Sequence, residues 1–270
     1  MKIFLGPAGV PLTSKKSDTL SGIERVAELS LGAMEVEFVR GVKMGNDLAA
    51  RAGEVARRLG VKLSVHAPYY INLCNPEKAT DSRKRILDSC EKANSMDAWV
   101  VVFHPGYYGK LEPDEALDMV YNACLEMSDF LGKNGWDVRL GLETTGKVSQ
   151  FGTLDEILAI CKKVKYCVPV IDWAHLYAKY QGAVDFKKIL KRVTDAGHGK
   201  IHTHFSNIEF TDKGERRHLT IDKKKPDFSE VAKVILKSGL QEITIISESP
   251  VLEKDSLVMK KELEMLGYKF

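Results

Sequence analysis

Cysteine is scarce in this sequence, with five residues in 270 and none of them in CxxC spacing. An odd number of scattered cysteines favours neither a disulfide framework nor a thiolate zinc site. Apolar runs are short as well, and none approaches the roughly 20 residues of a membrane span. The apolar run at the N-terminus is too short for a signal peptide. We therefore expect a protein of the reducing cytoplasm that has no membrane partner.

A large excess of one charge is also missing, because the formal net charge is only +3. This balance permits a nucleic-acid partner but does not argue for one, since that would need basic residues gathered on one face. Linkers and low-complexity tracts are absent. With 44% hydrophobic residues the chain can bury a sizeable core. We expect one domain, residues 1–270, and a monomer.

What the sequence does contain is a regular alternation of strand-like and helix-like segments. Eight such pairs in about 250 residues predict an α/β fold, a single (β/α)8 TIM barrel, over the rival open doubly wound sheet. Thr80 or Asp81 is expected to cap the third helix, and Thr153 to open a later one through a capping box. The strand that ends at Asp172 is expected to lead to a helix containing Ile189. A long polar loop is expected from His204 to Pro226.

Six of the strand-like runs close on a side chain that can bind a metal ion. They deliver, one per repeat, His66, His104, Glu143, Asp172, His204 and Glu248. A barrel brings all its carboxyl strand ends to one mouth, so only that fold gathers these residues into a single metal site.

The donor set indicates which metals fit. Together with His175 and His218 these residues offer nitrogen and oxygen donors without a thiolate, which suits Zn²⁺, Mn²⁺ or Fe. They are too many for one tetrahedral ion, so two or three ions that share a bridging carboxylate are expected. Glu143 is the natural bridge, and paired ions serve in-line phosphoryl displacement. We assign catalytic roles to Glu143 and Glu248.

Several segments carry a family resemblance. They are Ser64–Leu73 (SVHAPYYINL), Phe103–Gly106 (FHPG), Gly141–Gly146 (GLETTG), Val170–His175 (VIDWAH) and His204–Asn207 (HFSN). In this order they resemble the endonuclease IV family of apurinic/apyrimidinic endonucleases, a branch of the xylose-isomerase-like barrels. The resemblance implies three zinc ions at the barrel mouth. It also implies attack by a metal-activated hydroxide on the phosphate 5′ to an abasic sugar in double-stranded DNA, which is a DNA repair reaction.

The resemblance also implies roles for single residues. His66 and His104 would hold one ion, and Glu143 would bridge to a second. Asp172, His204 and Glu248 would be the other ligands of the second ion, and His175 and His218 would hold the third. Tyr69 would occupy the gap in the duplex, and Lys43 would do similar work.

The chain departs from the family pattern at the third ion. Family members commonly carry Asp-x-His there, whereas this chain has Arg216 where the Asp is expected before His218. Three readings stay open: Glu215 substitutes after a register change, the third site is weaker, or it is absent. The first loop, Gly6–Leu12, also lacks the family's usual opening.

Three further features have both a functional and a structural reading. Arg216 and Arg217, with Lys223–Lys225, form either a phosphate-gripping edge or a solvated loop. Tyr69 and Tyr70 are either a stacking wedge into DNA or ordinary lid packing. His202, two residues before His204 on the same strand, either supports a ligand from behind or fills the barrel interior.

Two other functions remain open. A sugar isomerase or epimerase would hold one ion, such as Mn²⁺, among Glu143, Asp172, His204 and Glu248, and the two glutamates would shuttle protons. Such a site would leave His66, His104 and His175 without a role as ligands, which favours the nuclease. A barrel that binds a nucleic acid or nucleotide with little turnover is the third reading.

Overall fold

Strands and helices alternate along the whole chain, and the computed structural model describes residues 1–270. The strands are β1 (Lys2–Pro7), β2 (Ala33–Glu37), β3 (Lys62–His66), β4 (Val100–Phe103), β5 (Gly106–Tyr107), β6 (Arg139–Glu143), β7 (Gln150–Phe151), β8 (Cys167–Asp172), β9 (Lys200–Phe205), β10 (Asn207–Thr211), β11 (Gly214–Leu219) and β12 (Glu242–Ser247). The helices are α1 (Thr19–Glu28), α2 (Asn46–Leu59), α3 (Pro76–Ser95), α4 (Pro113–Asn134), α5 (Leu154–Cys161), α6 (Trp173–Lys179), α7 (Phe186–Asp195), α8 (Phe228–Leu236) and α9 (Glu253–Met265), with a 3-10 turn, η1, at Ile221–Lys223. None of the helices combines the length and apolar character that a membrane crossing needs.

The chain divides into two compact units, which are described separately. The first contains Met1–Met34, Gly146–Val148 and Ile171–Phe270, and the second contains Glu35–Thr145 and Ser149–Val170. The prediction of one domain stays a prediction.

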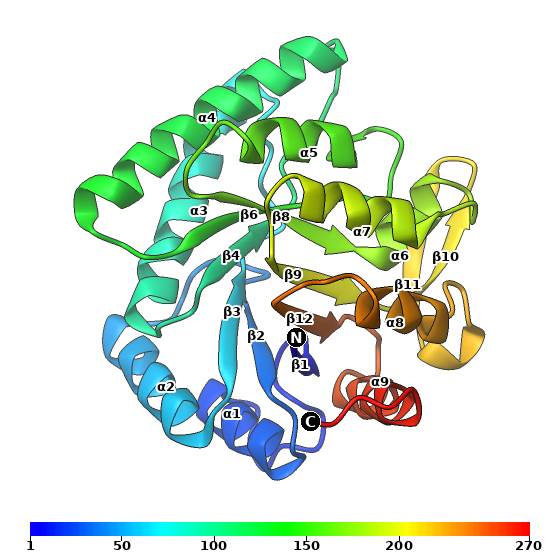
Figure 1. The fold of residues 1–270 in the computed structure, drawn as a ribbon. Coiled ribbons are helices and arrows are strands. Elements are labelled where there is room, and N and C mark those ends of the chain that lie inside the picture. The colour runs from blue at the N-terminus through cyan, green and yellow to red at the C-terminus, as the bar shows by residue number, and fades with distance from the viewer. The chain divides into compact units, whose positions relative to one another are not determined.

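In the first unit, β12 pairs in parallel with β1 on one side and with β9 on the other. Helix α6 packs against a hairpin formed by β10 and β11, drawn in yellow in Figure 1. The contact is apolar, because Ala174 and Ala178 of α6 bury against Ile208, and Phe210 lies beside Tyr177. This packing fixes the hairpin against the helix that follows Asp172.

The expected polar loop between His204 and Pro226 is therefore wrong in part, because residues 207–219 form this hairpin. A signal was present: Ile208 and Phe210 alternate with polar residues, and Asp212 and Lys213 form a two-residue turn before Gly214. Gly214 has φ +98°, which favours glycine. Helix α6 was likewise not expected as a separate element.

In the second unit the strands follow the order β8-β6-β4-β3-β2. The pairs β3–β4, β4–β6 and β6–β8 are parallel. Val100 and Val102 of β4 are buried against Val170, with Trp99 and Val168 packed around them. Parallel neighbours bring their carboxyl ends to the same edge. At this edge β3 ends in His66, β6 ends in Glu143, and His104 directly follows β4.

Helix starts follow local chemistry. The capping box of Thr153 is confirmed, since its hydroxyl accepts from the Glu156 amide while the Glu156 carboxylate accepts from the Thr153 amide. The predicted cap of the third helix at Thr80 or Asp81 is wrong. Asn75 caps α3 instead by accepting from the backbone amides of Glu77 and Lys78, and Pro76 occupies the first helical position, which proline favours.

Candidate metal centre

The first candidate cluster lies at the ends of three neighbouring strands of the second unit. His66 is the last residue of β3, His104 follows β4, and Glu143 is the last residue of β6. Glu143 Oε2 lies 3.3 Å from His66 Nε2 and 2.8 Å from His104 Nε2. The three donor atoms can face one ion, since they lie within 4.8 Å of one another. The structure thus brings these three side chains together, and their role as metal ligands stays a prediction.

The orientation of His66 suits a metal ligand. Its Nδ1 donates to the Ala67 carbonyl at 2.8 Å, so the lone pair of a neutral ring sits on Nε2, toward Glu143. Metal-binding histidines are commonly fixed in this way by a backbone carbonyl. Burial disfavours the charged ring, but the hydrogen bond that the protonated ring donates through Nε2 to Glu143, together with the charges of Glu37, Glu143 and Glu35, outweighs it and raises the pKa of His66 to about 10. The acidic surroundings therefore attract a cation at this ring.

The second candidate cluster lies in the first unit and contains His175, His218 and Glu248, whose donor atoms lie within 4.8 Å of one another. The His175 and His218 rings meet edge to face with centroids 5.3 Å apart. Ser206 Oγ lies 2.7 Å from His218 Nδ1, and Glu248 Oε2 lies 3.8 Å from the same nitrogen.

The same unit brings Asp172 and His204 beside Glu248, again within 4.8 Å. His204 Nδ1 lies 3.4 Å from Glu248 Oε1. Asp172 also organises the backbone, because its Oδ1 accepts from the His175 amide at 2.5 Å and caps α6. Its Oδ2 lies 3.6 Å from His175 Nδ1. The cap thus sets His175 one helical turn beyond the strand end.

Glu215 of β11 also reaches this cluster, with Oε2 3.1 Å from His175 Nε2. The structure places Glu215, and not Arg216, beside the histidines. Arg216 Nη1 and Arg217 Nε instead bind the two carboxylate oxygens of Glu209 at 2.7 and 2.6 Å. Their predicted contact with DNA phosphates stays a prediction.

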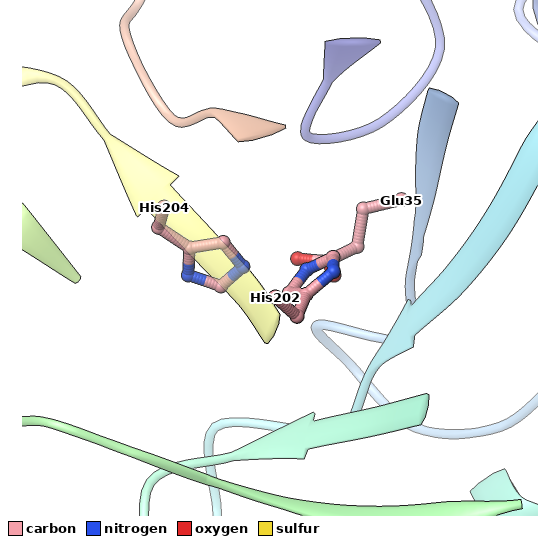
Figure 2. Close-up of side chains that lie close together, drawn as sticks. All are labelled: Glu35, His202 and His204. Atoms are coloured by element: carbon pink, nitrogen blue, oxygen red, sulfur yellow. The ribbon is translucent and has the colours of Figure 1, made fainter. Parts of the chain in front are cut away.

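Three further residues of the predicted site, Tyr69, Lys43 and His202, differ in exposure. Tyr69 is 61% exposed, with its ring centroid 5.9 Å from that of His66. Lys43 is exposed after β2. His202 is fully buried on β9, and its ring lies edge to face with that of His204 at 5.3 Å (Figure 2).

Sequence reasoning missed Glu35, a fully buried carboxylate on β2 that Figure 2 also draws. The Ser64 hydroxyl donates to its Oε2 at 2.7 Å. A signal existed, because a charged residue between Met34 and Val36 of a buried strand is unusual unless it is paired.

The residues present fit a metal ion. Their donors are imidazole nitrogens and carboxylate oxygens, and two ligands of a tetrahedral zinc ion at bond lengths of about 2.0–2.2 Å stand roughly 3.3 Å apart. The contacts of 2.8 to 3.3 Å from Glu143 to His66 and His104 are close to that spacing. None of the five cysteines belongs to a candidate group. Several groups of histidines and carboxylates in the structure could thus hold a metal ion.

Comparison with known proteins gives the family. A family model described as xylose isomerase-like TIM barrel matches residues 23–268. The chain belongs to this family. A probable endonuclease 4 of Mycoplasmopsis synoviae is 30% identical over 75% of this chain and 74% of its own length, which confirms the resemblance to the endonuclease IV family. An uncharacterised protein of Methanocaldococcus jannaschii is 36% identical over 96% of both chains.

Among solved structures, endonuclease IV from Thermus thermophilus matches this barrel with a TM-score of 0.75 and 20% identity, covering 98% of this chain and all of the other. A D-tagatose 3-epimerase-like protein matches with a TM-score of 0.73 and 24% identity, over 98% and 96% of the two chains. At these identities both likenesses show the fold alone. The predicted (β/α)8 TIM barrel is thereby confirmed, and the chain belongs to a family of enzymes.

Proposed function

We propose that this barrel is a zinc-dependent endonuclease that hydrolyses the phosphodiester 5′ to abasic sites in double-stranded DNA. The observation that carries the proposal is the cluster of His66, His104 and Glu143, because its two histidines lie outside the set of ligands that a single-ion sugar enzyme needs. His175 and His218 add a second histidine pair. The probable endonuclease 4 relatives support the same reading.

In this proposal, His66, His104 and Glu143 would hold one ion, and Asp172, His204 and Glu248 would hold another. The ions, when bound, lower the pKa of a water and stabilise the leaving alkoxide. The protein residues hold the phosphate and orient the duplex around them. Tyr69, exposed beside His66, stacks in the gap left by the missing base, because an aromatic face replaces the lost stacking. Lys43 neutralises a neighbouring phosphate.

The proposal is tested first by zinc content and cleavage in Glu143→Gln. Loss of the Glu143 carboxylate should remove zinc and reduce cleavage of an abasic duplex more than about 100-fold, beyond the 10–100-fold effect of groups that only support a ligand. Zinc per chain is counted by plasma mass spectrometry, and cleavage is followed on a labelled duplex with one abasic analogue.

Glu54→Gln, an exposed carboxylate on α2, is the matched control and should change neither quantity. Full zinc content together with full cleavage in Glu143→Gln would contradict the proposal.

A single-ion sugar epimerase is the second candidate. It is favoured by the grouping of Asp172 and His204 with Glu248 and by the barrel's likeness to a D-tagatose 3-epimerase-like protein. One metal equivalent per chain, epimerisation of a ketose and no cleavage of abasic DNA would establish it in place of the nuclease.

A further inference from the structure

We infer that Glu215 is the carboxylate ligand that completes the metal position of His175 and His218, in place of the Asp that the sequence lacks. The inference rests on the metal use of the proposed function. It also depends on an irregularity in the β10–β11 hairpin. Because of it, Glu215 and His218 lie on the same face of β11 although they are three residues apart.

The hairpin contains a β-bulge at Arg216. Thr211 pairs with Gly214 and Phe210 with Glu215, but Glu209 pairs with Arg217, so Arg216 is an extra residue in β11. A bulge sets two residues of one strand against one residue of its partner. Glu209 accordingly meets both arginines, at 2.7 Å from Arg216 and 2.6 Å from Arg217.

The bulge determines which side chains share a face. Directly opposite residues of an antiparallel pair lie on the same face, and faces alternate along a strand. Glu215 therefore shares a face with Phe210, and His218 shares that face with Ile208. Without the bulge, residues three apart would lie on opposite faces. The extra residue gives Glu215 and His218 the relation that Asp-x-His has in a regular strand.

That shared face points toward α6, where His175 lies. Ile208 is buried against Ala174 and Ala178, and the Phe210 ring packs edge to face on Tyr177. The two arginines lie on the other face with Glu209. The packing thus turns the carboxylate toward His175 and keeps the positive charges away from the metal position.

The contact between Glu215 and His175 has the form of two ligands facing one ion. Glu215 Oε2 lies 3.1 Å from His175 Nε2 but makes no hydrogen bond. Two donors of a tetrahedral zinc ion stand roughly 3.3 Å apart. The Glu215 side chain is only 15% exposed, and Lys147 Nζ lies 3.8 Å from its second oxygen. A largely buried carboxylate oxygen without a hydrogen bond is the kind of group a cation satisfies.

Gly146 makes room for this side chain. A Cβ atom added to Gly146 would lie 2.2 Å from Glu215 Oε2, which is too close for any real contact. The Gly146 carbonyl also accepts from the Glu215 amide at 3.1 Å. The backbone therefore anchors Glu215 at the point where its side chain turns toward the cluster.

The test is the zinc content of Glu215→Gln, which keeps the shape of the side chain and removes its charge. Each variant is purified without chelator and analysed by plasma mass spectrometry. We expect Glu215→Gln to hold about one zinc ion fewer per chain than the wild type, and His218→Ala to lose the same ion. The double variant should lose no more than either single variant. Asp212→Asn, at the exposed turn of the same hairpin, should match the wild type.

A second readout uses Co²⁺ added to metal-free protein, followed by visible absorbance. Glu215→Gln should lose one phase of the titration, while its thermal unfolding in chelator should match that of the wild type. Equal zinc content and equal Co²⁺ titrations in wild type and Glu215→Gln would overturn the assignment. Failure of the wild type to cleave abasic DNA would overturn the proposed function but leave this metal count unaffected, so the two failures are distinguishable.

Discussion

At the scale of single residues, Asp172 caps a helix and is at the same time a proposed metal ligand. One of its oxygens caps α6 through the His175 amide, and the other lies near the His175 ring. The two tasks need different chemistry, because a cap needs only a short oxygen acceptor whereas a metal ligand needs the negative charge.

Two substitutions of Asp172 should separate these tasks. Asp172→Asn keeps a good cap, so the free energy of unfolding in chelator should change by less than about 0.5 kcal/mol, while zinc content falls. Asp172→Ala removes the cap as well and should cost about 1 kcal/mol more. Denaturant titrations in chelator and zinc analysis measure the two effects. A larger loss of stability in Asp172→Asn than in Asp172→Ala would contradict this division.

At the scale of elements, the bulge in the hairpin β10–β11 brings Glu215 and His218, which are three residues apart, onto one face of the strand. Arg216 stands two residues before His218 and cannot ligate a cation, and the bulge places its side chain on the face that meets Glu209. The irregularity of β11 at Arg216 therefore determines which side chains face the candidate metal position.

Deletion of Arg216 provides the direct check. The pairs Thr211–Gly214 and Phe210–Glu215 would then continue in register through Glu209–Arg217 and Ile208–His218. Because Glu215 and His218 would stay on one face, the deletion variant should keep the zinc content of the wild type. Insertion of one alanine after Arg216 should instead reduce it, because with the bulge kept the added residue puts Glu215 and His218 on opposite faces of β11. Zinc content is measured in both variants. Equal zinc content in the insertion variant and the wild type would show that the bulge does not position Glu215.

At the scale of the whole molecule, the cysteines report on the integrity of the core. All five are buried and free. Burial raises the pKa of Cys74 to about 12 and also raises the pKa values of Cys90, Cys161 and Cys167. Reactive thiolates are therefore nearly absent from the folded protein at neutral pH.

We expect iodoacetamide to label the native protein only as fast as it unfolds, and to label all five cysteines in guanidinium. The folded pKa values lie above the ordinary thiol value of about 8.5, so the unfolded chain loses these protons first. Stability from this source is present below about pH 8.5 and declines as the pH rises toward 12. Intact-mass spectrometry over time measures the labelling, and rapid modification of the native chain at pH 7 would contradict the expectation.

The sequence determined features that depend on near neighbours. Strand-helix alternation predicted the barrel, and the residues at which strands end predicted His66, His104 and Glu143, because side chains at the ends of parallel strands share one edge. The helix start at Thr153 was equally local.

Only the tertiary structure decided the rest. The hairpin, its bulge and the approach of Glu215 to His175 depend on pairing between β10 and β11 and on packing against α6. Glu35 became a candidate only through its burial on β2. The physical reason is that register and burial are set by contacts between distant residues, and a shift of one residue moves a side chain to the opposite face of a strand.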